Sequence, residues 1–248
     1  MKLTILGCAG TFPGPDGPCS GYLVEHDGFR LVIDLGAGAL GQLQRHCGLL
    51  DVDAVYISHL HADHCIDLVA YAYARRYHPD GIAPQLPVYG PAGTRQRIAS
   101  SFESPPIDGL LEVFDFHEQG PMRMQLGPFT VTTVVVNHPV ECHAIRLEAG
   151  GQSLVYSADT GESDALVELA RDCDLLLCEA SWLSDREHPV GVHLTGRQAA
   201  EHAKRAGVGA LLLTHLVAFV DPALVLAEAQ QAFDGDVTLA RSGASYDL

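Results

Sequence analysis

The sequence predicts an α/β protein of the αββα type, in which two stacked β-sheets lie between outer layers of helices. Predicted hairpins dominate the first half of the 248-residue chain, and strands alternate with helices more regularly in the second half. That order favours two sheets packed face to face with helices outside. Hydrophobic residues make up 47% of the chain, enough for a sizeable core. Since no linker, low-complexity tract or short-period repeat interrupts the pattern, we expect a single domain over residues 1–248.

The first half starts with a strand over residues 2–6, which alternates and ends at Gly7. Residues 10–21 are so rich in Gly and Pro that they must form a loop, either a plain surface loop or a lip of a functional site. A hairpin through Asp27-Gly28 follows. Its strands cover residues 22–25 and 30–33. A helix to about residue 47 comes next. The remaining strands of this half are expected over 54–57, 87–90 and 111–116, and the remaining helices over 66–77 and 92–101.

The second half alternates more evenly. Strands are expected over 129–136, 142–148, 153–157, 175–178, 210–213 and 237–240, and helices over 164–171, 195–206 and 222–233. Gly150-Gly151 marks a hairpin turn between two of these strands. Pro222 opens the last helix, at a position where its missing N–H is not needed.

The charge balance narrows the class of partner. Acidic residues outnumber basic ones 31 to 15, so the formal net charge is −16. Binding to a nucleic-acid backbone depends on Lys and Arg, and this charge therefore argues against a broad RNA- or DNA-binding face. Bound divalent cations would offset part of the charge locally. A small phosphate ester held at a metal centre remains compatible with the composition.

Cysteine usage and hydropathy indicate the compartment. The seven Cys are an odd number, scattered and without a CxxC pair, which is typical of a reducing cytosol and not of a disulfide framework. The first apolar run is too short for a secretory segment, and no run of about 20 apolar residues occurs elsewhere. We expect a soluble cytoplasmic protein with no membrane segment.

Residues 58–64, SHLHADH, form the most informative segment of the chain. They directly follow the apolar run of residues 54–57. If the chain stays extended, His59, His61 and Asp63 point the same way, because side chains alternate along a strand, and His64 must come from a bend. Two metal ions a few ångströms apart would use such a cluster, whereas a closed structural zinc site needs fewer ligands so close together. The alternative is a plain loop in a chain with 13 His.

Three further ligand-type side chains each follow a predicted strand. They are His138, Asp159 and His215. Sites in α/β proteins gather beyond strand ends, where loops converge on a rigid scaffold. Taken alone, these residues could be a turn residue, a helix cap and a core histidine. Asp34 ends another strand, and it either caps the turn or supports a metal-bound His from behind.

The pattern His59-x-His61-x-Asp63-His64, with His138, Asp159 and His215, resembles the metallo-β-lactamase superfamily of binuclear hydrolases. The resemblance covers nearly the whole chain. It implies one metal ion on His59, His61 and His138 and a second on Asp63, His64 and His215. Asp159 is implied to bridge the two ions. The redox-active branch of the superfamily replaces one His of the first motif by an acidic residue, so the retained His61 indicates a hydrolase.

The chemistry of this ligand set agrees with hydrolysis. Imidazole nitrogens and carboxylate oxygens suit zinc, and also manganese or iron, and no Cys stands at a ligand position. A water between two divalent ions loses a proton near neutral pH and becomes a nucleophile. Asp63 could orient that nucleophile while it binds the second ion. The ions would also stabilise the charge that develops on an attacked phosphoryl group.

A second stretch points to phosphodiesters. Residues 178–182, CEASW, and then residues 193–195, HLT, resemble elements of the phosphodiesterase branch that includes tRNase Z. The resemblance implies that Glu179 positions His193, and that His193 contacts the phosphate or assists the leaving oxygen. The alternative for His193 is a plain residue at a helix start, beside the cap Thr195.

Two departures argue against tRNase Z itself. Its first long loop carries Lys and Arg, whereas this loop reads FPGPDGPCSGY, and only a hairpin fits between His138 and Asp159 where bacterial tRNase Z inserts a tRNA-gripping arm. Several sequence segments, among them GPDGPCSGYLVE and LVIDLGAGALG, instead resemble those of stand-alone atypical cyclic-nucleotide phosphodiesterases.

We therefore expect a phosphodiesterase for a small phosphodiester such as cAMP. The alternatives are a tRNase Z-like endoribonuclease, a thioesterase or lactonase of the same fold, and a metal-dependent nucleotide sensor. The resemblance also implies a homodimer, with Trp182 and the first loop near its interface. Arg75 and Arg76 are expected at a solvated helix tip, with a phosphate contact as the alternative.

Overall fold

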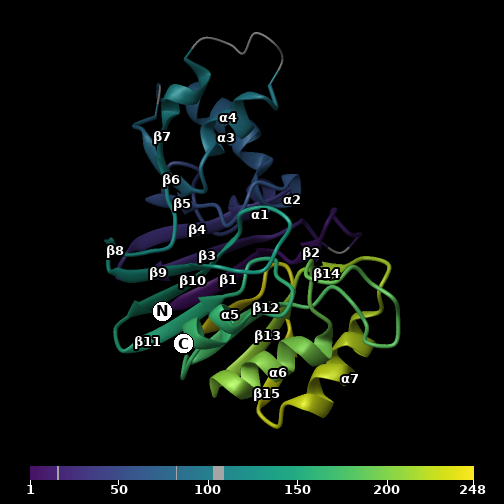
Figure 1. Ribbon diagram of the computed structural model, residues 1–248. Helices are drawn as coiled ribbons and strands as arrows, with labels where there is room; N and C mark the ends of the chain where they lie inside the picture. The colour runs from purple at the N-terminus through teal and green to yellow at the C-terminus, as the bar shows by residue number, and fades with distance from the viewer. Residues whose placement is uncertain (16, 82, 103–108) are drawn as a thin grey trace.

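The computed structural model describes residues 1–15, 17–81, 83–102 and 109–248 (Figure 1). Most of the strands lie in two sheets. The first sheet has the order β16 (Ser245–Asp247), β1 (Lys2–Gly7), β3 (Gly21–His26), β4 (Phe29–Leu35), β5 (Ala54–Tyr56), β6 (Leu86–Gly90) and β7 (Phe114–Glu118). The second has the order β15 (Asp236–Leu239), β13 (Ala210–Thr214), β12 (Leu175–Glu179), β11 (Gln152–Tyr156), β10 (His143–Ala149), β9 (Phe129–Val135) and β8 (Met122–Leu126).

The two sheets pack face to face, and helices cover their outer sides (Figure 1). Four helices accompany the first sheet: α1 (Ala39–Leu43), α2 (Ala62–Cys65), α3 (Asp67–Arg76) and α4 (Thr94–Ala99). Three accompany the second: α5 (Asp164–Leu169), α6 (Gly196–Ala206) and α7 (Pro222–Ala232). The predicted αββα sandwich is confirmed. No helix of the described residues is long and apolar enough to span a bilayer.

The strands of the first sheet show why their sequences are apolar throughout. On β4, Leu31 and Ile33 join the core between the sheets, whereas Val32 joins the smaller core under the outer helices. A strand covered on both faces buries every side chain, so it reads as a continuous apolar run and not as an alternating one. Tyr22 and Tyr156 meet across the sheets, with their ring centroids 4.8 Å apart.

Parallel strands set the position of the site. In the first sheet β4, β5, β6 and β7 run parallel, and in the second β11, β12, β13 and β15 do so. Parallel neighbours end at the same edge of a sheet, and the loops beyond those ends converge. The third sheet is a short ribbon in which β2 (Ala9–Gly10) pairs with β14 (Leu216–Val217).

Some expected elements differ from the structure. The helix expected to reach residue 47 ends at Leu43, and residues 110–113 form the 3₁₀ helix η1 (Leu110–Val113) where a strand was predicted. Leu110 and Val113 are three residues apart and buried, which is the period of a 3₁₀ turn. The strands β2, β8, β14 and β16 were not predicted. β2, β14 and β16 have two or three residues and exist because partners distant in sequence pair with them, whereas β8 forms a hairpin with β9.

Arg75 is not part of a solvated helix tip, and this prediction was wrong. Its side chain is 3% exposed, and its guanidinium donates to the carbonyl oxygens of Leu49 and Pro84. The Tyr71 ring lies under the same guanidinium at 5.4 Å. Arg75 therefore ties two loops to α3 through its two terminal guanidinium nitrogens, and its burial keeps it from contacting a phosphate in solvent. Arg76, by contrast, is half-buried.

Candidate metal centre

Asp34, the last polar residue of β4, holds the start of the segment after β5, residues 58–64, in place. One Asp34 oxygen accepts from the Ser58 backbone N–H at 2.7 Å, and the other accepts from the Ser58 hydroxyl at 2.8 Å. Asp34 has φ 56°, in the left-handed region that non-glycine residues seldom adopt. That strained turn is compensated by the hydrogen bonds that its carboxylate makes. The metal-ligand segment therefore starts from a fixed point.

The first ligand cluster consists of His59, His61, His138 and Asp159, whose ligand atoms all lie within 4.8 Å of one another. The His59 Nε2 and His138 Nε2 atoms lie 3.1 and 3.2 Å from His61 Nδ1. Three imidazole nitrogens that face one point are an arrangement that a divalent cation stabilises, because each nitrogen presents a lone pair to it. His59 is fully buried, whereas His61 and His138 are partly exposed.

The second cluster consists of Asp63, His64, Asp159 and His215. His215 Nε2 lies 3.3 Å from an oxygen of Asp63 and 3.3 Å from an oxygen of Asp159. His64 Nε2 lies 3.3 Å from the other oxygen of Asp159. Asp159 thus belongs to both clusters, as a carboxylate that bridges two ions would. The structure brings all seven expected ligands together.

The condition of an extended chain past β5 does not hold, because α2 begins at Ala62, and this helical turn is the bend expected for His64. His59 and His61 therefore face the first cluster, while Asp63 and His64 turn into the second. Asp63 and His64 are neighbours in a helical turn, so both side chains can reach one ion. In an extended chain they could not, because successive side chains there point to opposite sides.

Two unpartnered buried atoms test whether the site suits a metal. Within the described residues, His64 Nε2 and Asp159 Oδ1 have no hydrogen-bond partner, although both are buried. Burying a polar atom without a partner is unfavourable, and a cation between them would satisfy both. The ligand set of imidazoles and carboxylates is also one that zinc, manganese or iron prefers. These residues fit a divalent metal centre.

The protonation states support metal binding as well. Burial and the neighbouring imidazoles hold the pKa of His59 well below its usual value, so its ring is neutral and its lone pair is available. Burial by itself would raise the pKa of Asp63, but hydrogen bonds from His215 and His64 outweigh it and hold that pKa far below the usual range. The site therefore presents a neutral His59 ring and an ionised Asp63 carboxylate. Burial opposes protonation of His64, but the Asp159 and Asp34 carboxylates outweigh it and raise the pKa of His64 well above its usual value, so metal binding there would displace a proton.

The ligands are oriented by partners behind them. His64 Nδ1 lies 2.7 Å from Asp34, and the Tyr156 hydroxyl donates to the same carboxylate oxygen at 3.0 Å. Of the two alternatives considered for Asp34, the structure shows the contact to a ligand-type histidine, and the same carboxylate also accepts from Ser58. His215 Nδ1 lies 2.8 Å from the Ser181 hydroxyl. Such partners fix the tautomer and the orientation of a ligand ring.

Glu179 and His193 lie beside both clusters. A Glu179 oxygen accepts from His193 Nδ1 at 2.9 Å and from the Thr160 backbone N–H at 2.7 Å. Burial opposes protonation of His193, but the Glu179 carboxylate outweighs it and raises the pKa of His193 to about 9. His193 Nδ1 is also 3.9 Å from an oxygen of Asp159. The structure thus places a charged imidazolium at the edge of the metal centre.

Sequence reasoning did not find several residues that shape the site. Ser58, Ser181 and Tyr156 orient its carboxylates and histidines, yet each is a common residue type in an apolar strand or strand end. The Thr11 backbone N–H donates to Asp63 at 2.9 Å, so the first loop does form a lip of the site. Asp16 of that loop lies outside the described residues. Trp182 packs against His193, with ring centroids 5.8 Å apart.

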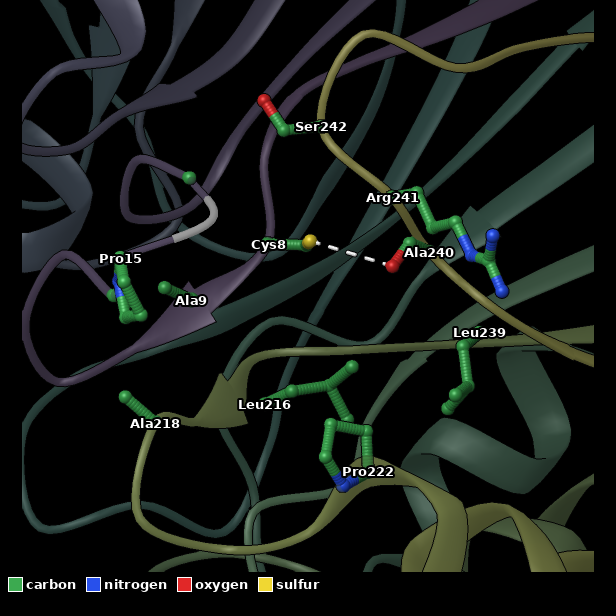
Figure 2. Close-up of a pocket in the computed structure, with 12 residues that line it drawn as sticks. Cys8, Ala9, Pro15, Leu216, Ala218, Pro222, Leu239, Ala240, Arg241 and Ser242 are labelled. Atoms are coloured by element: carbon green, nitrogen blue, oxygen red, sulfur yellow. Dashed lines mark hydrogen bonds between the residues drawn. The ribbon is translucent and has the colours of Figure 1, made fainter.

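A cavity of about 470 Å³, whose lining residues are drawn in Figure 2, includes none of the seven ligand-type residues. Ala9 and Leu216, which pair across the β2–β14 ribbon, both line it. Gly10, the next residue on β2, faces His215, since a Cβ added there would lie 2.8 Å from the His215 ring. Successive strand residues face opposite sides. The cavity and the metal centre thus lie on the two faces of this ribbon. Among the described residues that line the cavity, Arg241 is the only charged one.

Imidazoles and carboxylates gathered beyond the strand ends of an αββα sandwich define a metal-dependent hydrolase of the metallo-β-lactamase fold. The chain belongs to the family described as the beta-lactamase superfamily domain, which matches residues 29–216. This membership confirms the class expected from the sequence.

Several relatives cover nearly the whole chain. The protein Rv1339 of Mycobacterium tuberculosis is 44% identical over 242 residues, which are 96% of this chain and 88% of the relative. YhfI of Bacillus subtilis, named as a metallo-hydrolase, is 32% identical over 246 residues, 98% of each chain. The crystal structure of YhfI superposes with a TM-score of 0.88 over 99% of both chains. Ribonuclease Z of Myxococcus xanthus is 26% identical over 304 aligned positions, which cover 100% of this chain and 98% of the relative.

Proposed function

We propose that this protein is a binuclear phosphodiesterase that hydrolyses a small phosphodiester, and specifically a 3′,5′-cyclic nucleotide such as cAMP. The observation that carries the proposal is the pair Glu179–His193 beside two ligand clusters that share Asp159. Metal ligands alone would serve many hydrolases. An imidazolium oriented by a buried carboxylate adds a proton donor, which an alkoxide leaving group requires.

Each group has a distinct task in the proposed reaction. Two bound divalent ions would supply an activated water and would neutralise charge on the phosphoryl oxygens. His193, protonated near neutral pH, donates a proton to the leaving ribose oxygen as the P–O bond breaks. Glu179 holds the His193 ring through Nδ1 and stabilises its charged form. Asp63, fixed by the Thr11 N–H, orients the attacking water with its carboxylate.

The metals are proposed to be two zinc ions, with manganese or iron as alternatives. The first cluster offers three imidazoles and a carboxylate, and the second offers two imidazoles and two carboxylates. Zinc accepts both sets, and so do manganese and iron, because none of the seven ligands is a thiolate. A solved relative of the same fold, PqqB of Methylobacterium extorquens, is named as zinc-bound.

Charge and shape support a small substrate over tRNA. The net charge of −16 repels an extended phosphate backbone. The chain between His138 and Asp159 forms only the hairpin of β10 and β11, which leaves no projecting arm there.

We propose that the protein is a homodimer and that it is located in the cytoplasm. All seven cysteines are free, which agrees with a reducing compartment.

Turnover by purified, zinc-loaded protein tests the proposal. We expect cAMP to be converted to AMP, and we expect His61→Ala to lower the rate at least about 1000-fold, because it removes a ligand of the first cluster. Tyr77→Ala, an exposed residue after α3, is the matched control and should keep full activity. Undiminished turnover by His61→Ala would contradict the metal mechanism. Absence of turnover with every 3′,5′-cyclic nucleotide would contradict the substrate.

The second candidate is an endoribonuclease, because relatives named ribonuclease Z align over the whole chain. Cleavage of precursor tRNA at a rate far above that of cAMP would establish it. A thioesterase or lactonase would use the same ligands but gives no role to the Glu179–His193 pair. A nucleotide sensor would bind cAMP and leave it intact after prolonged incubation.

A further inference from the structure

Two phenylalanines form an exposed aromatic pair on the loops that border the second ligand cluster. Phe12 follows β2, and Phe219 follows β14. Their ring centroids are 5.5 Å apart, with 39° between the ring planes. The side chains are 39% and 70% exposed, respectively. Exposing two large apolar rings side by side is unfavourable in water, so the pair gains stability from anything that covers it.

The β2–β14 ribbon holds this pair beside the metal centre. Val217 pairs with Gly10, and Gly10 in turn abuts the His215 ring. Thr11, the residue before Phe12, donates its N–H to Asp63. Adjacent Cα atoms are about 3.8 Å apart, so the Phe12 Cα lies about that far from the Cα of Thr11, the residue that contacts Asp63. The pair is thereby tied to two ligands of the second cluster, Asp63 and His215.

The loop that follows Glu179 has a different surface. There the Val192 carbonyl accepts from His138, and Val190 is aliphatic and 95% exposed. The aromatic rings of that loop, Trp182 and His188, stack on each other and are half-buried, so they offer less open ring surface than Phe219. The Phe12–Phe219 pair does offer π-faces, and stacking on them needs no positive charge, which suits a chain with a net charge of −16.

We infer that the Phe12–Phe219 pair is a nucleobase subsite, on which the aromatic base of the substrate stacks while its phosphodiester lies at the metal centre. This inference rests on the proposed function, since it assigns the base of that substrate. Base stacking on aromatic side chains is strong and tolerant of base identity. The enzyme is therefore expected to accept adenine and guanine nucleotides alike and to discriminate against phosphodiesters that lack a base.

Binding of two product-like ligands to the zinc-loaded protein tests the subsite without relying on turnover. Titration calorimetry compares AMP with ribose 5-phosphate, which lacks the base. We expect the wild type to prefer AMP, and Phe219→Ala to weaken AMP binding roughly 5- to 50-fold while ribose 5-phosphate stays within about twofold. Phe219→Tyr keeps a π-face and should restore the preference. Tyr77→Ala removes an exposed ring elsewhere and should change neither affinity.

Three results would overturn the inference. The first is equal affinity of the wild type for AMP and ribose 5-phosphate. The second is an equal loss of affinity for both ligands in Phe219→Ala. The third is a change in the oligomeric state of Phe219→Ala with the base preference intact, which would make the pair a subunit contact. The proposed function fails separately. If the base preference is present but no cyclic nucleotide is hydrolysed, the subsite stands and the proposed reaction is wrong. If cAMP is hydrolysed without base preference, only the subsite is wrong.

Discussion

The two ligand clusters share Asp159 but differ in composition and burial. Apart from that residue, the first cluster is built of imidazoles, and two of them are partly exposed. The second adds the Asp63 carboxylate, and its His64 and His215 are almost completely buried. Its histidines also have the stronger supporting contacts, to Asp34 and Ser181. From this contrast we expect that the second cluster would retain a bound ion more firmly, while the first cluster is more open to solvent.

The difference follows from the origin of each cluster in the chain. The second cluster takes Asp63 and His64 from one helical turn, α2, and His215 from the position directly after β13. The first takes two ligands from the irregular residues before α2 and one from the loop after β9. Ligands on regular elements are held by backbone hydrogen bonds, so they keep their positions better than ligands on loops.

Asp159→Asn is expected to have the largest effect, because it removes the charge that both clusters share. An amide oxygen is a weaker ligand than a carboxylate oxygen, and we expect at least about a 1000-fold loss of kcat/KM. Metal analysis should show both ions weakened, not only one. Asp185→Asn, with an 80% exposed side chain, removes the same charge from the surface and is the control. Loss of one ion with the other fully retained would show that the clusters do not depend on a shared ligand.

Glu179→Gln is expected to have an intermediate effect that depends on pH. The pKa of His193 is raised to about 9, so the Glu179–His193 pair stabilises the fold below pH 6.5 and loses this contribution as the pH rises through 9. Without the carboxylate the pKa falls towards roughly 6.5 or lower. At pH 8 the protonated fraction would fall from roughly nine-tenths to a few per cent, and the rate would fall about 30-fold.

The pH profile of kcat/KM is the measurement that checks this. Its alkaline limb should move down by at least about 2.5 pH units in Glu179→Gln, and part of the activity should return near pH 6. Metal content should stay at the wild-type value, which separates this effect from a loss of ligands. An alkaline limb that does not move would mean that His193 is not the proton donor.

Ser181→Ala is expected to have the smallest effect, and it affects one cluster only. The Ser181 hydroxyl contacts His215 at 2.8 Å and donates to Glu179 at 3.0 Å. Removing a supporting partner typically costs about 10- to 100-fold in metal affinity, and here the loss should fall on the second ion. Competition with a chelator measures it. Ser184→Ala removes an exposed hydroxyl from the same loop as a control, and equal weakening of both ions would contradict the assignment of Ser181 to His215.

The fold and the ligand set were largely predictable from residue types and their order. Apolar runs covered on both faces, such as β4, are visible as uninterrupted Leu, Val and Ile. His59, His61, His138 and His215 follow strands, and strand ends are where sites gather. Arg75 shows the limit of such reasoning. A charged residue near a helix end is usually solvated, and only the loops folded around α3 bury this one.

Composition and spacing by themselves determined that this chain forms two sheets and carries a metal-binding motif, because periodicity and ligand chemistry are local properties. Only the tertiary structure shows how the grouping implied by the family resemblance comes about, since α2 turns Asp63 and His64 away from His59 and His61. It also brought Phe12 beside Phe219 through a ribbon of two-residue strands. Pairings between segments more than 200 residues apart depend on the closure of the whole fold, and no local pattern encodes them.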